Sequence, residues 1–321
     1  MKPYPLLLKP PVKDYLWGGS RLKTEYGYAC DGDIAAEAWV LSCHKDGSSV
    51  VMNGDCAGQT LPEVLAQWGN ATIGEKAAAF PYFPVLIKLI DARDRLSVQV
   101  HPDNDYALRV EGEFGKTEMW YVVDCEPGAQ LIYGFRQGLT KDEFRARIEN
   151  DTLPEVCNFV PVKKGDVFFI QAGTLHAIGA GILIAEVQQN SNTTYRVSDY
   201  GRLGADGKPR ALHVDKAVDV TATVPPAIPY GDVGETTALP GGQVRPLASC
   251  TFFTAQLLDV TDTLHVGCMD SFTSLLCLDG HCRLTADGHE PLELHKGSSV
   301  FLPAGMTAAL SGQAQFLCSR V

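Results

Sequence analysis

Residues 165–176 read GDVFFIQAGTLH, and residues 297–308 read GSSVFLPAGMTA. Each segment begins with a glycine, continues through mostly apolar residues and reaches an Ala-Gly turn. The residues before them also match in kind, because 118–131 and 271–284 both read as a strand, a polar turn with glycine and a second strand. This repeat predicts two β modules of common ancestry, of which only the first keeps a histidine, His176, after its turn.

Short strand-like segments account for much of the chain. Segments such as AQLIYGF (129–135), GILIAEVQQ (181–189) and SFTSLLCLD (271–279) are rich in β-branched and aromatic residues and are separated by Gly, Asp and Pro. Short strands divided by such turn residues are typical of an antiparallel sandwich or barrel. The sequence therefore predicts a mainly β protein with a few decorating α-helices.

Helices are expected mainly within residues 57–80 and 139–160. Residues 60–63, TLPE, place Thr and Glu three positions apart before the apolar run VLAQWG, which is the spacing of a helix capping box. Residues 140–143, TKDE, repeat this signature, and residues 152–155, TLPE, are expected to open another short helix.

The composition is that of a globular protein with reduced thiols. The 321 residues are 45% hydrophobic and 20% charged, and the net charge of −11 argues against nucleic acid or an anionic membrane as the main partner. The N-terminal run MKPYPLLLKPPVKDYLW lacks the apolar stretch of a signal peptide, and no later segment reaches membrane-spanning length. The ten scattered cysteines include no C-x-x-C pair. These features predict a cytoplasmic protein.

Four side chains have the spacing of a metal site. In RLSVQVHPDND (95–105), residues two apart on a strand face the same way, so Gln99 and His101 would share one face. Glu118 begins the next strand-like run, and His176 follows the turn of the first repeat. Imidazole and carboxylate ligands suit Zn²⁺ and several other divalent metals, and this number of protein ligands leaves room for water or substrate.

The order of these residues is the two-part cupin pattern. It runs from [HQ]-x-H to a carboxylate, and then to a glycine turn that ends in histidine. Here Gln99 replaces the first histidine and Gln171 replaces the usual proline. The pattern predicts cupin-like jelly-roll barrels, the first of which binds the metal.

The second barrel is expected to lack this site. It has Ala308 at the place of the histidine, and SFTSLLC offers no carboxylate to match Glu118. A proline-rich segment, TVPPAIPYGDVG (223–234), reads as a linker before it. We therefore expect a catalytic, metal-binding cupin domain with helical insertions in residues 1–225. Residues 226–321 would form a degenerate cupin-like domain that covers apolar surface of the first.

In these motifs the chain resembles a known family, the type I mannose-6-phosphate isomerases in their short bacterial form. The resemblance runs in order from residue 4 to about residue 220, and the last third matches only as a degenerate cupin barrel. The segments that carry it are YLWGG (15–19), EAWVLS (37–42), FPVLIKLIDARDRLSVQVHPDN (83–104), GKTEMWYVVD (115–124) and QAGTLHAIGAGILIAEVQQNSNTTYRVSDYGR (171–202).

The resemblance implies a metal and a reaction. In that family the glutamine and histidine of Q-x-H-P, the glutamate of K-x-E-M and the histidine of G-T-x-H-A hold one zinc ion. Carried over, these ligands are Gln99, His101, Glu118 and His176. The reaction interconverts mannose 6-phosphate and fructose 6-phosphate through a cis-enediol, which requires a proton carrier and stabilisation of developing negative charge.

Three residues are candidates for the catalytic groups beside the metal. Lys116 lies two positions before Glu118, so both would point into the same cavity if they lie on a strand. Glu186 lies in the apolar run ILIAEVQQ, and Arg196 resembles the family's arginine near the reacting carbons. Each could instead form a structural ion pair, and the residue that moves the proton is left open.

Phosphate binding requires cations and hydroxyls. Ser97 lies two positions before the metal-site glutamine and shares its face, and Lys88 supplies charge. Arg202 stands where the family places a basic residue. Trp17 and Trp39 would line the cavity or pack in the core.

Two alternatives remain open at this stage. One is another metal-dependent cupin enzyme, such as a dioxygenase, which would use a redox metal. The other is a non-catalytic cupin that binds a sugar phosphate. For the isomerase, the expected partner is a small sugar phosphate, with no nucleic acid and no membrane, and the chain is expected to be a monomer or a weak homo-oligomer.

Overall fold

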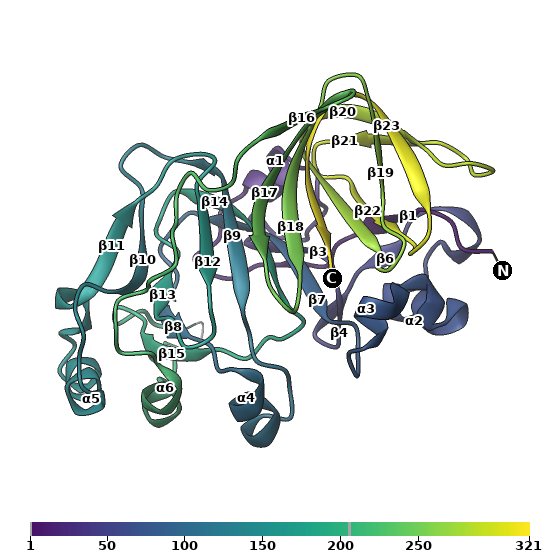
Figure 1. Ribbon diagram of the computed structural model, residues 1–321. Coiled ribbons are helices and arrows are strands. Elements are labelled where there is room, and N and C mark those ends of the chain that lie inside the picture. The colour runs from purple at the N-terminus through teal and green to yellow at the C-terminus, as the bar shows by residue number, and fades with distance from the viewer. Residues whose placement is uncertain (1, 205–206) are drawn as a thin grey trace.

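β-Strands dominate the structure, a computed structural model that describes residues 2–204 and 207–321 (Figure 1). Nearly all of the strands belong to three antiparallel sheets. A small hairpin of β4 (Cys43–His44) and β5 (Gly47–Ser48) lies beside them. The expectation of a mainly β protein decorated by a few helices is confirmed.

Two of the sheets enclose one core and form the first barrel, most of which lies in the left half of Figure 1. The larger has the order β12 (Val167–Ile170), β9 (Glu118–Cys125), β14 (Ile182–Gln189), β7 (Val85–Ala92), β3 (Glu37–Leu41) and β2 (Val12–Lys13). The smaller has the order β11 (Cys157–Pro161), β10 (Gln130–Phe135), β13 (His176–Ala177), β8 (Val98–Val100) and β15 (Tyr195–Ser198). Trp120, Leu131 and Phe168 pack between them.

The central strands of the larger sheet are buried on both faces. In β14, Ile182 and Ile184 face the core of the first barrel, whereas Leu183 and Ala185 belong to a second core on the opposite side of the sheet. All eight residues of β14 are buried. A strand covered on both faces reads as a nearly continuous apolar run, which explains the segment GILIAEV.

The third sheet forms the second barrel. Its order is β16 (Thr237–Leu239), β17 (Gly242–Ser249), β18 (Thr254–Val260), β23 (Thr307–Arg320), β20 (Thr273–Thr285), β22 (Ser299–Leu302), β1 (Leu6–Lys9) and β6 (Val50–Val51). In addition, β19 (Thr263–Gly267) pairs with β23, and β21 (Leu292–His295) pairs with β20. Because β1 pairs with β22, residues from the N-terminus complete the C-terminal sheet. The boundary near residue 225 stays a prediction.

The second core joins the two barrels. Met119 and Leu183 from the first barrel pack in one cluster with Leu276 and Phe301 from the second. This contact confirms the expectation that the second barrel covers apolar surface of the first. Figure 1 shows the two barrels side by side, with β9 and β7 next to β17 and β18.

The longer helices begin at the expected caps. Helix α2 (Leu61–Trp68) follows a capping box in which the Glu63 carboxylate accepts from the backbone N–H of Thr60 at 2.8 Å, and α5 (Lys141–Glu149) is capped by Thr140. The 152–155 segment forms only a 3₁₀ turn, η3 (Leu153–Glu155). The other helical segments are α1 (Arg21–Thr24), η1 (Gly54–Cys56), η2 (Asn70–Thr72), α3 (Gly74–Ala78), α4 (Asn104–Val110) and α6 (Val214–Val220).

The repeated segments have the same backbone geometry. Gly165 and Gly297 precede β12 and β22 with φ of 93° and 91°, and Gly173 and Gly305 occupy the following turns with φ of 87° and 77°. Positive φ is favourable only for glycine, so both pairs of glycines are required by the same two turns. The prediction of a structural repeat therefore agrees with the turn geometry.

None of the ten cysteines, all of which lie in the described residues, forms a disulfide. Among the described residues, no helix combines the length and the apolar character that spanning a membrane would require.

Candidate metal centre and reaction cavity

Three of the expected metal ligands converge from separate strands. His101 directly follows β8, Glu118 begins β9 and His176 begins β13. The two imidazole Nε2 atoms lie 3.1 Å apart, and the carboxylate of Glu118 lies 3.4 Å from Nε2 of His176 and 3.8 Å from Nε2 of His101. One ligand atom from each residue falls within a span of 4.8 Å, and the three side chains are at most 1% exposed.

Backbone carbonyls orient both imidazoles. Nδ1 of His101 lies 2.9 Å from the carbonyl oxygen of Thr193, and Nδ1 of His176 lies 2.8 Å from that of Thr174. Since a carbonyl only accepts, each Nδ1 donates and each Nε2 presents its lone pair to the centre. Burial lowers the pKa of His101 well below its usual value and that of His176 to about 3, so both rings are neutral near pH 7.

This donor set fits a divalent cation. Two Nε2 lone pairs face each other, and the buried Oε1 atom of Glu118 has no hydrogen-bond partner among the described residues. Burial and the negative charge of Glu186 raise the pKa of Glu118, against the opposing effect of Lys116. A cation between these atoms would satisfy all three groups and favour the ionised carboxylate. Two imidazoles and a carboxylate are also a common ligand set for zinc.

Gln99, the fourth expected ligand, lies on a strand that pairs with the strand of His176. On β8 it pairs directly with His176 of β13 on one side and with Arg196 of β15 on the other. It also lines the adjoining cavity. The strand pairing thus brings together residues that lie as far apart as 99 and 196 in the sequence.

A row of alternating charges extends from the metal centre. Nζ of Lys116 contacts Oε2 of Glu118 and lies 3.7 Å from Glu186, whereas Nζ of Lys88 lies 3.5 Å from both Glu186 and Glu37. All five side chains are buried. Burial raises the pKa of Glu186, but the two lysines outweigh this effect and lower it. Burial in turn lowers the pKa of Lys88, and Glu37 with Glu186 raises it above the usual value.

A cavity of about 300 Å³ opens beside the metal centre. Its wall includes seven of the residues expected from the sequence: Trp17, Lys88, Ser97, Gln99, Lys116, Glu186 and Arg196. The Nε atom of Arg196 is buried and has no hydrogen-bond partner among the described residues, while its Nη1 donates to the carbonyl oxygen of Ala211 at 3.1 Å. The candidate metal ligands therefore lie beside this cavity, and most of the expected substrate contacts line it.

Arg202 is not brought to this cavity. Its guanidinium donates to the carbonyl oxygen of Arg95 and lies 3.6 Å from Asp94, and it is absent from the cavity wall. A second arginine, Arg210, lines the cavity instead and makes two hydrogen bonds to Asp199, at 2.7 and 2.6 Å. The backbone N–H of Arg202 donates to the carbonyl oxygen of Asp199 at 3.0 Å and closes a turn there.

Sequence reasoning missed part of the cavity wall. Arg210 lies in a loop with no periodicity, so no signal marked it. Glu37 could have been predicted in the same way as Lys88, since both are charged residues within an apolar strand segment. Strand β3 is fully buried, and a buried charge requires a partner. Trp39 packs in the core rather than on the cavity: it is 0% exposed, and its Nε1 donates to Glu37 at 2.8 Å. The other missed wall residues are Tyr15, Ile90, Leu96, Ile178, Asn192 and Thr194.

Two protein-family models match separate parts of the chain. The catalytic domain of type I phosphomannose isomerase matches residues 6–120, and the cupin domain of mannose-6-phosphate isomerase matches residues 244–321. The second match confirms the cupin-like fold expected for the C-terminal barrel.

Individual relatives cover nearly the whole chain. A mannose-6-phosphate isomerase of Streptococcus mutans is 39% identical over 93% of this chain and 92% of its own length. One from Bacillus subtilis is 36% identical over 99% of both chains. The crystal structure of a Bacillus subtilis mannose 6-phosphate isomerase superposes with a TM-score of 0.90 at 33% identity, covering 99% of this chain and 100% of that one.

A more distant structure shares the fold alone. A putative mannosephosphate isomerase from Archaeoglobus fulgidus has a TM-score of 0.76 at 21% identity and covers 98% of this chain and 97% of its own. The fold is thus retained where most of the sequence is not. On the identity, coverage and fold together, this chain belongs to the mannose-6-phosphate isomerase family, type I.

Proposed function

We propose that this protein interconverts mannose 6-phosphate and fructose 6-phosphate and uses one zinc ion per chain. The observation that carries the proposal is the convergence of His101, Glu118 and His176 on one buried point. This point lies beside a cavity of about 300 Å³, whose wall includes Lys116, a direct contact of Glu118. The names of the relatives supply the substrate, and the donor set supports the metal. Gln99 completes the proposed ligand set.

The isomerisation moves one proton between neighbouring carbons. A base removes the proton from C2 of the open-chain aldose, a cis-enediol forms, and a proton is delivered to C1 while the hydroxyl proton passes from O2 to O1. The bound ion would act as a Lewis acid that stabilises negative charge on these oxygens. The chain must therefore supply a proton carrier and hold the sugar against the cavity wall.

Lys116, Glu186 and Arg196 are the proposed catalytic residues. Lys116 is the cation nearest to the metal ligands, with Nζ 3.3 Å from Nε2 of His101. Glu186 keeps its charge because Lys88 and Lys116 lower its pKa, and its buried Oε1 atom makes no hydrogen bond among the described residues. Arg196 lines the cavity with an unpartnered Nε.

The remaining polar residues are proposed to bind the rest of the substrate. Ser97, Lys88 and Trp17 lie on the cavity wall, as phosphate and sugar binding require. Arg202 is kept as a candidate phosphate ligand only by the resemblance to the family. Arg210 is the stronger candidate, since it lies on the wall and its guanidinium is held in place by Asp199.

The decisive experiment combines metal analysis with an isomerase assay. Purified protein should contain about one zinc per chain and convert mannose 6-phosphate into fructose 6-phosphate, as measured by an assay coupled to oxidation of the derived glucose 6-phosphate. Removal of the metal with a chelator should abolish turnover, and added zinc should restore it. Full activity of metal-free protein would refute the role of the metal, and iron-dependent oxygen uptake would favour a dioxygenase.

We further propose that the protein works in the cytoplasm as a monomer or weak homo-oligomer. Ten cysteines without a disulfide among the described residues are consistent with a reducing compartment. The division into a metal-binding part, residues 1–225, and a part without a metal site, residues 226–321, belongs to the same proposal. The proposed metal ligands and cavity residues all precede residue 225.

A further inference from the structure

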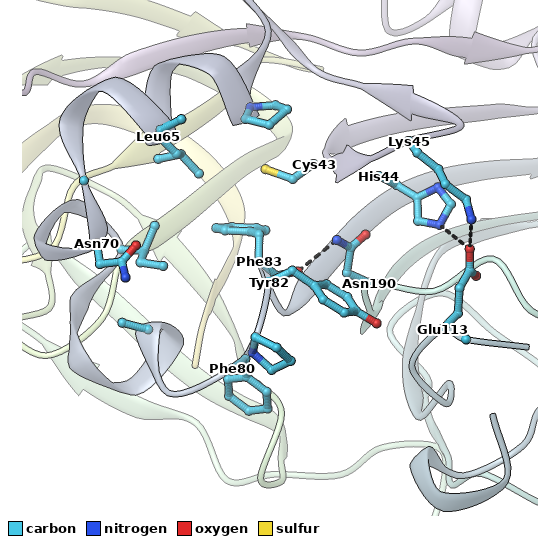
Figure 2. A pocket seen from close by; sticks show the side chains of 17 residues that line it. Cys43, His44, Lys45, Leu65, Asn70, Phe80, Tyr82, Phe83, Glu113 and Asn190 are labelled. Atoms are coloured by element: carbon cyan, nitrogen blue, oxygen red, sulfur yellow. Dashed lines mark hydrogen bonds and ion pairs between the residues drawn. The ribbon is translucent and has the colours of Figure 1, made fainter. Parts of the chain in front are cut away.

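A second cavity, larger than the first, lies between the small hairpin and helices α2 and α3 (Figure 2). Its volume is about 480 Å³, within the ~300–1,000 Å³ range of small-molecule sites. No residue of its wall belongs to the wall of the reaction cavity. Neither the metal centre nor the proposed isomerisation gives this cavity a role.

One side of the cavity is apolar. Phe80, Phe83, Leu65 and Ile73 contribute side chains to it, together with the smaller Pro62, Ala66, Ala78 and Pro81. Aromatic and branched side chains around a space of this size suit a flat ring, because ring faces and edges pack well against them.

The opposite side carries hydrogen-bond donors. The Lys45 ammonium lies 2.5 Å from the Glu113 carboxylate and is otherwise open to solvent, with 72% of its side chain exposed. Nδ1 of His44 accepts from the backbone N–H of Asp46, so the proton of the neutral ring is on Nε2, which lies 3.9 Å from Glu113. Figure 2 shows both side chains directed at Glu113.

Tyr82 adds a third donor at this end. Its hydroxyl oxygen accepts from the backbone N–H of Phe114 at 2.8 Å, and Phe114 is the neighbour of Glu113 in the chain. No described residue accepts the hydroxyl proton of Tyr82, and an ammonium such as Lys45 has three protons to donate. Glu113 is the single carboxylate on the wall. Asn190 adds a buried amide oxygen with no hydrogen-bond partner among the described residues, so the wall offers acceptors as well as donors. The protons that Lys45 and Tyr82 keep beyond these contacts suit an anionic group at this end of the cavity.

We propose that this cavity binds a small aromatic acid. The ring lies between Leu65, Phe80 and Phe83, and the carboxylate accepts from Lys45 and Tyr82. The site is separate from the reaction cavity, and its existence does not depend on the proposed isomerase activity.

Titration of the zinc-loaded protein with three probes tests the ligand class. The probes are phenylacetate, 2-phenylethylamine and acetate, followed by ligand-observed NMR. Phenylacetate should bind at least about threefold more tightly than the amine, the size of effect expected for one solvent-exposed ion pair. Acetate, which has no ring, should bind much more weakly than phenylacetate. Equal affinity for the acid and the amine, or no binding of phenylacetate, would overturn the proposal.

Substitutions locate the binding. Ala66→Trp should fill the cavity from helix α2 and abolish phenylacetate binding, whereas Gln67→Trp, one residue further on the same helix and outside the wall, should preserve it. Lys45→Gln, at an exposed side chain, should remove the preference for the acid over the amine. The carboxylate of phenylacetate could also bind the metal ion. If phenylacetate still binds the Ala66→Trp variant, it binds outside this cavity, and the proposed site is refuted.

Discussion

The two imidazoles of the metal centre depend on their own backbone partners. Thr193 and Thr174 fix Nδ1 of His101 and His176, so the geometry of both Nε2 atoms is set before any ion arrives. We expect His176→Ala to lose bound zinc and to reduce kcat by at least about 100-fold, since loss of a Lewis acid is worth several kcal/mol of transition-state stabilisation. Elemental analysis and the coupled assay measure both effects.

A surface histidine provides the control for this substitution. His265 is exposed on β19, so His265→Ala should keep both zinc and activity. A His176→Ala protein with a full complement of zinc would contradict the proposed ligand set.

The two candidate phosphate arginines can be separated by kinetics. Arg210→Gln should raise KM for mannose 6-phosphate by roughly 10–100-fold, because one hydrogen bond to a charged group contributes about 1.5–3 kcal/mol. Arg202→Gln should leave KM nearly unchanged, because its guanidinium bonds to the carbonyl of Arg95 away from the cavity. A larger rise in KM for Arg202→Gln than for Arg210→Gln would identify Arg202 as the phosphate ligand. Thermal unfolding of both variants checks that the loss of the Asp199 pair has not unfolded Arg210→Gln.

At the scale of the structural element, the repeated turn offers a matched pair of substitutions. Gly173 and Gly305 both have positive φ, so replacement of either by Ala should cost about 1–2 kcal/mol of unfolding free energy. Only the turn at Gly173 leads into His176. In addition, a Cβ at Gly173 would lie 2.9 Å from the carbonyl oxygen of Val220, whereas one at Gly305 would meet open space.

We therefore expect Gly173→Ala, but not Gly305→Ala, to weaken zinc binding. A competition titration with a chromophoric chelator measures the zinc affinity, and chemical denaturation measures the stability of each variant. Equal zinc affinity in the two variants would show that the turn does not position His176.

At the scale of the whole molecule, the shared core decides how the chain unfolds. Met119 and Leu183 of the first barrel are buried against Leu276 and Phe301 of the second, and strand β1 lies in the sheet of the second barrel. Neither barrel can leave the other without exposing apolar surface. We expect one cooperative thermal transition, with the calorimetric enthalpy equal to the van't Hoff enthalpy. Two separated transitions would mean that the barrels are stable independently.

The sequence by itself determined the strands, the capped helices and the candidate metal ligands. These features depend on local chemistry: glycine at positive φ in both repeats, Thr and Glu three positions apart before α2, and the two-residue period that puts Gln99 and His101 on one face. Helix α4 carried such a signal too, since its cap, Asp103, precedes it directly in the sequence. Local rules suffice where the partners are close in the chain.

Only the tertiary structure decided which residues meet across long separations. Strand β1 joins β22 although almost 300 residues separate them, and Arg210 rather than Arg202 reaches the cavity. Register between distant strands and the path of an irregular loop depend on the packing of the whole core, which no local pattern encodes. The physical reason is that apolar burial is non-directional: it requires that a face be covered but does not specify which segment covers it.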